Sequence, residues 1–154
     1  MNTDLLAPFA NATCETLKLL LDVDARTGTA GATDGCAEDK ARISVAIGIT
    51  GDVSGEALYR FPVDTTLEIV KTMSGMEFTE IDEFVTSALG EIANIISGNA
   101  VTDLSGRQIT CDILPPKILD GEELPSAADC TYVYSAKIDS SIGDVEVVLR
   151  VKTD

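Results

Sequence analysis

Apolar positions follow two different periods along this chain, and the change of period predicts both helices and strands. Helical spacing marks three segments: residues 5–21, 64–74 and 79–97. Strict alternation marks four: residues 41–50, 57–61, 132–138 and 145–151. Two shorter segments are weaker, a strand over residues 109–114 that Pro115 and Pro116 end, and a short helix over residues 101–106.

Polar caps and glycines mark the ends of the expected helices. Asp4, Asp64 and Thr79 are the candidate N-caps, because their side chains can accept from the first free backbone N–H groups. Gly75 is expected to end the second helix. Gly98, followed by Asn99, is expected to interrupt the third helix after Ser97.

The order of these elements predicts the fold class. Two hairpins, with turns near Gly51 and over residues 140–143, are separated by helices. That order is typical of an α+β domain with an antiparallel-rich sheet built from hairpins and with helices packed on it. The 154 residues suffice for one core, so we expect a single domain over 1–154. Residues 24–40 and 117–128 have no period and are expected to be mostly loop, the first with one strand at most.

The third helix divides into an apolar face and a polar stripe. The expected core face carries seven residues: Phe84, Val85, Ala88, Leu89, Ile92, Ile95 and Ile96. The stripe beside it carries four: Ser87, Glu91, Asn94 and Gly98. Because side chains three apart on a helix project the same way, Glu91 and Asn94 lie one turn apart on one face. We expect this stripe to be accessible, with Gly98 leaving room for a partner to approach.

The charge of the chain narrows its partners. Twenty-six acidic and eleven basic residues give a net charge of −15, without any cluster of Lys and Arg. Nucleic acid and anionic membrane surfaces are therefore not expected as partners. The chain also shows neither a cationic leader nor an apolar run of membrane-spanning length, which favours the cytoplasm.

The residues available for chemistry are limited. Histidine is absent, which excludes Ser-His and Cys-His nucleophiles and His metal sites. The four cysteines form no CxxC pair and are expected to be free, buried thiols. The remaining acidic residues are scattered, so no metal site is expected. The pattern Glu91-x-x-Asn94 is short, and taken alone it more often marks a solvated helix face.

The residues around this pattern resemble a known family. The segment GEIANIISGNA, residues 90–100, is similar to the phosphatase helix of the CheC/CheX/FliY family, which dephosphorylates the chemotaxis response regulator CheY. The family pattern of Asp or Ser, then Glu, then Asn falls on Ser87, Glu91 and Asn94. The segment APFANATCETLKLL, residues 7–20, resembles the first helix of CheX-type members. Glu15-x-x-Lys18 lacks the amide of a second motif, and this favours CheX over CheC.

The resemblance implies a function and the roles of the site residues. The implied activity is hydrolysis of the phosphoaspartate of a CheY-like receiver domain in chemotaxis signalling. Asn94 would orient the attacking water, Glu91 would contact the receiver's Lys, and Ser87 and Gly98 would belong to the partner-binding surface. The chain would need no cofactor of its own, since Mg²⁺ belongs to the receiver. A homodimer joined by β-strand pairing is also implied.

Two other classes of function stay open at this point. A non-catalytic regulator or adaptor of a two-component or chemotaxis system could share the same fold. A small-ligand-binding α+β domain would need an apolar cavity with converging polar groups, to which nothing in the sequence points.

Overall fold

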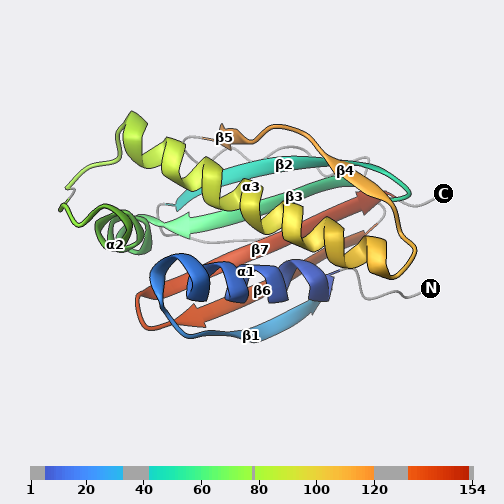
Figure 1. Ribbon diagram of the computed structural model, residues 1–154, viewed down its shortest axis with the longest axis horizontal. Coiled ribbons are helices and arrows are strands. Elements are labelled where there is room, and N and C mark those ends of the chain that lie inside the picture. The colour runs from blue at the N-terminus through green and yellow to red at the C-terminus, as the bar shows by residue number, and fades with distance from the viewer. Residues whose placement is uncertain (1–5, 33–41, 78, 120–131, 153–154) are drawn as a thin grey trace.

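The computed structural model describes residues 6–32, 42–77, 79–119 and 132–152 (Figure 1). The helices in these ranges are α1 (Leu6–Leu21), α2 (Val63–Ser74) and α3 (Glu83–Gly106). The strands are β1 (Ala25–Ala32), β2 (Arg42–Gly51), β3 (Ser54–Pro62), β4 (Cys111–Ile113), β5 (Lys117–Leu119), β6 (Tyr132–Ser140) and β7 (Gly143–Lys152).

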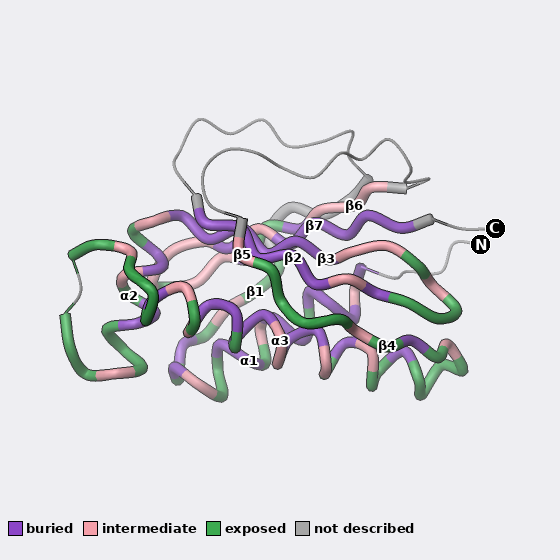
Figure 2. The backbone as a smooth tube through the Cα atoms, turned by 90° about the horizontal axis from the view of Figure 1, so that it is seen from above, coloured by how far each residue is buried: buried purple, intermediate pink, exposed green. Residues whose placement is uncertain are grey.

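The strands form one antiparallel sheet. Their order is β1-β6-β7-β3-β2-β4, and β5 pairs with another part of β2. The hairpins β2–β3 and β6–β7 sit next to each other because β3 pairs with β7. Figure 2 shows α1 and α3 on one face of this sheet. The predicted α+β class, with hairpins and helices packed on the sheet, is confirmed.

The core lies between the sheet and these helices. Alternate residues of the central strands point toward the helices and are fully buried, among them Val45, Ile47, Tyr59, Val147 and Leu149. α1 contributes apolar side chains at helical spacing, including Phe9, Leu17 and Leu21. The two periods expected from the sequence therefore meet in one core.

The opposite face of the sheet carries a cross-strand ladder between β3 and β7. Leu58 and Val148 pair in its centre, and an ion pair lies on each side of them. Arg60 donates to Glu146 at 3.0 Å, and Arg150 donates to Glu56 at 3.2 Å. Each pair joins residues that are directly opposite in the strand register, where cross-strand pairs stabilise a sheet.

Two of the predicted helix caps are wrong. α2 begins at Val63, directly after Pro62, and no side chain caps it, so Asp64 lies inside its first turn. α3 is capped by Asp82 instead of Thr79, and the Asp82 carboxylate accepts from the Val85 N–H at 3.0 Å. Gly75 ends α2 with φ of 76°, as predicted. The predicted cap Asp4 lies outside the described residues.

The predicted break at Gly98 is also wrong, because α3 continues without interruption to Gly106. A glycine inside a helix costs about 1 kcal/mol relative to alanine. Ala100 and Leu104, which follow it, are buried against the rest of the protein. Their burial offsets the cost, so residues 101–106 form the last turns of α3.

Three edge segments differ from the sequence-based expectation. Residues 25–32 of the expected loop form β1, which pairs with β6 through a register shift between Thr27 and Ala30. β4 is shorter than predicted, and the two prolines after it interrupt the pairing without ending it. β5 then resumes pairing with β2 at residues 117–119. Proline lacks an N–H, so it is tolerated at such an edge. Most of the second expected loop, residues 120–128, lies outside the described residues.

The buried face of α3 is turned by about 90° around the helix axis from the predicted one. Ile92 and Ile96 are buried as expected, but Phe84 is 54% exposed. Ala88 and Ile95 are only partly buried. Small residues that were not assigned to the core face are buried instead, namely Gly90, Ala93, Ser97 and Ala100. Small side chains let the helix approach its neighbours closely, and this decides which face turns inward.

A buried hydrogen bond fixes α3 to the sheet. The hydroxyls of Tyr59 on β3 and Ser97 on α3 are 2.8 Å apart, and both residues are fully buried. Burial raises the pKa of Tyr59 well above its ordinary value, so the phenol stays protonated. This bond joins the centre of the sheet to the inner side of α3.

The Tyr59–Ser97 bond predicts non-additive stability changes. Tyr59→Phe and Ser97→Ala should each lower the free energy of unfolding by about 1–3 kcal/mol, because each leaves one buried hydroxyl unpaired. The double variant should lose less than the sum of the two, because no orphaned hydroxyl remains. Urea unfolding of the four proteins measures this coupling, and strictly additive losses would contradict it.

The observed rotation of α3 predicts opposite outcomes for two large apolar side chains. Ile92→Ala should lower the free energy of unfolding by about 2–5 kcal/mol, because Ile92 is fully packed. Phe84→Ala should change it by about 0.5 kcal/mol or less, because more than half of that side chain is in solvent. Thermal and urea unfolding provide the measurement. Equal losses in both variants would mean that Phe84 belongs to the core.

Candidate functional site

The outward side of α3 carries the polar stripe expected from the sequence. Ser87 and Glu91 are exposed, and Asn94 and Gly98 are partly exposed. The side chains behind them, including Leu89, Ala93 and Ile96, are buried. The prediction that these four residues share an accessible face of one helix is therefore confirmed, although the helix is rotated.

The local sequence explains why α3 holds this stripe rigidly. Asp82 caps its N-terminus. At the other end the Leu104 carbonyl accepts from the N–H groups of Arg107 and Ile109. The Asp52 carboxylate accepts from the Thr110 N–H at 2.8 Å, which fastens the chain after α3 to the β2–β3 turn. A site on a helix fixed at both ends keeps its side chains in a constant geometry.

Glu91 and Asn94 are the polar groups that could act together. The side chain of neither makes a hydrogen bond or ion pair within the part of the chain that the structure describes. An amide offers one acceptor and two donors, and a carboxylate offers only acceptors. One turn of helix therefore presents a group that can orient water and a group that can bind a cation.

The fold itself does not require a glycine at position 98. A Cβ built there meets no atom within 4 Å, and the residue has ordinary helical backbone. Gly90 differs, since a Cβ there would touch Pro116 and Ile118 at 3.7–3.8 Å. The missing side chain at Gly98 thus leaves open space on the outward face of the helix.

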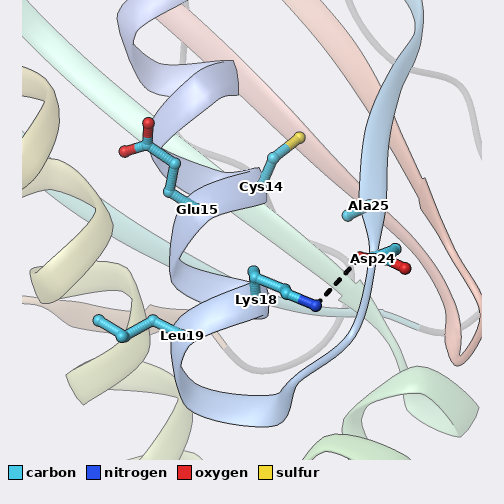
Figure 3. A pocket seen from close by; sticks show the side chains of 6 residues that line it. All are labelled: Cys14, Glu15, Lys18, Leu19, Asp24 and Ala25. Carbon is cyan, nitrogen blue, oxygen red and sulfur yellow. Dashed lines mark hydrogen bonds and ion pairs between the residues drawn. The ribbon is translucent and has the colours of Figure 1, made fainter.

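α1 does not present a second copy of this arrangement. Lys18 stands where an amide would be, and its amine is 3.2 Å from Asp22 and 3.3 Å from Asp24. These two acids raise the pKa of Lys18. Figure 3 shows Lys18 turned toward Asp24 and away from Glu15. Glu15 and Lys18 on α1 therefore do not form a second site of Glu and amide, because Lys18 belongs to a group of ion pairs at the end of the helix.

A surface hollow of about 490 Å³ lies beside α1 and next to β1 (Figure 3). Its lining includes three charged residues, Glu15, Lys18 and Asp24, and the amine of Lys18 is already paired with Asp24. Small-ligand sites are concave and enclose most of the ligand, with a few polar groups that converge on it. This hollow is a shallow depression open to solvent, and the Lys18 amine on its wall is already paired, so it gives no support to the ligand-binding alternative.

Other reactive groups in the described residues do not form a site. No group of three or more Asp, Glu or Cys residues there is placed to hold a metal ion. Cys14 and Cys111 are free, and burial raises the pKa of both thiols, which makes them poor nucleophiles. Cys36 and Cys130 lie outside the described residues. None of the described helices has the length and apolar character needed to cross a membrane.

Sequence reasoning missed one part of this surface. Phe84 and Ile95, both assigned to the core, lie on the outward side of α3 in line with Glu91. The only available signal was the scarcity of charge around them, since Glu91 is the single charged residue from position 84 to 102.

Comparisons with known proteins identify the family of this chain and agree with its fold. The family described as Chemotaxis phosphatase CheX matches residues 43–136. The CheY-P phosphatase CheX of Thermotoga maritima is 32% identical over 111 residues, which cover 71% of each chain.

Solved structures share the fold over nearly the whole chain. The chemotaxis protein CheX of Vibrio vulnificus is 21% identical with a TM-score of 0.86, covering 97% of this chain and 100% of that one. The CheX–CheY–BeF₃–Mg²⁺ complex of Borrelia burgdorferi is 24% identical with a TM-score of 0.81, covering 98% and 99%. The family match spans more than half of the sequence and contains the whole of α3, so this chain belongs to the CheX family of chemotaxis phosphatases.

Proposed function

We propose that this protein hydrolyses the phosphoaspartate of a CheY-like receiver domain, with Glu91 and Asn94 as its catalytic residues. The observation that carries the proposal is the accessible Glu91-x-x-Asn94 pair on a rigid helix, in a chain of the CheX family. The curated Thermotoga maritima relative is named a CheY-P phosphatase, which supports the choice of substrate.

Asn94 acts on the attacking water. Its side-chain oxygen accepts a hydrogen bond from that water and holds the water in line with phosphorus. The amide does this without gaining or losing a proton. Loss of phosphate from an acyl phosphate needs little covalent help, so positioning of the water dominates the barrier. A protein without histidine can supply this chemistry.

Glu91 acts on the receiver. Its exposed carboxylate pairs with a lysine near the phosphoaspartate, which docks α3 over the receiver's site. Ser87 and Gly98 lie on the same stripe and complete the contact surface, Ser87 as a small polar group and Gly98 as a point of close approach.

Mg²⁺ belongs to the receiver in this mechanism. The Borrelia burgdorferi complex contains CheY, BeF₃ and Mg²⁺ together with CheX, which supports a metal on the partner's side. The residues that the structure describes here offer no cluster suited to a metal ion. We therefore propose that the chain has no cofactor of its own.

The setting of the protein is also a proposal. We propose that the chain acts in the cytoplasm, where receivers of chemotaxis pathways are found, without nucleic acid or membrane as a partner. We also propose a homodimer formed by pairing of sheet edges. The two edges of the sheet, β1 on one side and β4 with β5 on the other, support this because an unpaired edge can accept another strand.

Substitution of Asn94 should separate catalysis from binding. Asn94→Ala should lower the rate of phosphate loss from a phosphorylated receiver by about 10²–10³-fold, because the lost interaction develops in the transition state. Its affinity for a receiver activated by beryllofluoride and Mg²⁺ should stay the same.

Glu91→Gln should weaken both affinity and rate, since the charge serves docking and geometry together.

Two exposed residues of α1 provide matched controls. Asn11→Ala and Glu15→Gln make the same chemical changes on a helix without the motif, and they should leave rate and affinity unchanged. Full activity in Asn94→Ala would overturn the proposed mechanism. A wild-type protein that binds the receiver without hydrolysing the phosphoaspartate would favour the adaptor function instead.

Gly98 should show a conflict between stability and activity. Gly98→Ala should raise the free energy of unfolding by up to about 1 kcal/mol, because alanine is the better helix former and its Cβ meets no atom. The same methyl group should weaken receiver binding by blocking close approach. Thermal unfolding and a binding titration measure the two effects.

Gly106 is the matched control for this change. It is the last residue of α3, and a Cβ there also meets no atom within 4 Å. Gly106→Ala should leave receiver binding unchanged. If Gly98→Ala binds and turns over like the wild type, Gly98 has no part in the contact.

A further inference from the structure

The outward side of α3 carries large apolar side chains in line with Glu91. Phe84, Glu91, Ile95 and Thr102 lie within about 40° of one another around the helix axis. Phe84 is 54% exposed, and Ile95 is partly exposed. Phe84 and Ile95 stand about 16 Å apart along the axis, with Glu91 between them. The single acid is therefore flanked by apolar surface on both sides.

Charge is scarce on this surface. Charged residues make up 24% of the chain, yet Glu91 is the only one among residues 84–102. The exposed side of α1 is different, since Glu15, Lys18 and Asp22 follow one another there at helical spacing. α1 thus has the composition of a solvated helix, and the outward side of α3 does not.

Neither the core nor solvation accounts for this composition. The buried face of α3 is turned away from Phe84, which is 54% exposed, and from Ile95, which is only partly buried. Low charge together with an exposed aromatic residue is instead the composition of the centre of a protein–protein interface. The surface is continuous with the stripe of Ser87, Glu91, Asn94 and Gly98, so one partner would cover both.

We propose that the outward side of α3 from Phe84 to Thr102 is a low-charge docking surface for the receiver domain, with Phe84 and Ile95 as its main sources of affinity. This inference rests on the proposed function, since it takes the receiver as the occupant. The matching partner surface has apolar side chains around a single cation. Contact with Phe84 and Ile95 removes water from around Glu91, and its ion pair with that cation becomes stronger in the lower dielectric.

The inference predicts a loss of affinity without a loss of maximal rate. Phe84→Ala and Ile95→Ala should each raise the Kd for a CheY-type receiver, activated by beryllofluoride and Mg²⁺, by about tenfold. KM for the phosphorylated receiver should rise in parallel. The rate at saturating receiver should stay near that of the wild type, because apolar contacts are the same in the ground and transition states. Asn94→Ala should show the reverse pattern.

Leu19→Ala is the matched control, because Leu19 is an apolar side chain of α1 with 78% exposure. It should leave Kd and KM within about twofold of the wild type. Thermal unfolding of all variants shows whether a change in Kd comes from loss of fold, and Phe84→Ala should unfold at the wild-type temperature.

The outcomes distinguish this inference from the proposed function. If Phe84→Ala and Ile95→Ala both bind as tightly as Leu19→Ala, the docking surface is wrong, whatever the activity of the wild type. If the wild type binds a receiver without hydrolysing its phosphoaspartate, the proposed function is wrong, and the Kd comparison still decides the docking surface. If the wild type binds none of the CheY-type receivers of its own organism, both proposals are overturned.

Discussion

The close packing of α3 on the sheet is the constraint on which the rest of the structure depends. Small residues on its inner side, Ala93, Ser97 and Ala100, are fully buried. The Tyr59–Ser97 bond then fixes the helix at its middle. With the inner side determined in this way, the outward side follows from helical geometry alone. The orientation of Glu91 and Asn94 is thus set by residues that never touch a partner.

This arrangement suits chemistry that depends on position more than on protonation. An amide cannot change its charge, so whatever Asn94 contributes comes from where it is held. Capping at Asp82 and the Asp52–Thr110 bond hold both ends of α3. The outward side, by contrast, carries residues that an isolated helix in water would not favour, a mid-helix glycine and an exposed phenylalanine. Their presence is best explained by a partner that covers them.

The elements with strong local patterns were predictable from the sequence. Alternation in β2, β3, β6 and β7 and helical spacing in α1 correspond to the observed strands and helix. The weak patterns failed, since β1 is rich in Gly, Thr and Ala, and β5 has only three residues. Such edge strands form because a neighbouring strand offers unpaired N–H and C=O groups, and that neighbour is distant in sequence.

The sequence by itself determined that Glu91 and Asn94 share one face, because residues three apart on any helix do so. It also determined that this face is accessible, since burial of an unpaired carboxylate would be costly. Only the tertiary structure decided how far α3 is rotated, that it continues through Gly98, and that Phe84 is exposed and Ile95 only partly buried. The reason is that helix rotation and length depend on how closely two surfaces fit. Small residues set that fit against Tyr59 and the sheet, and a hydrophobic period measured along one segment contains no information about the surface opposite.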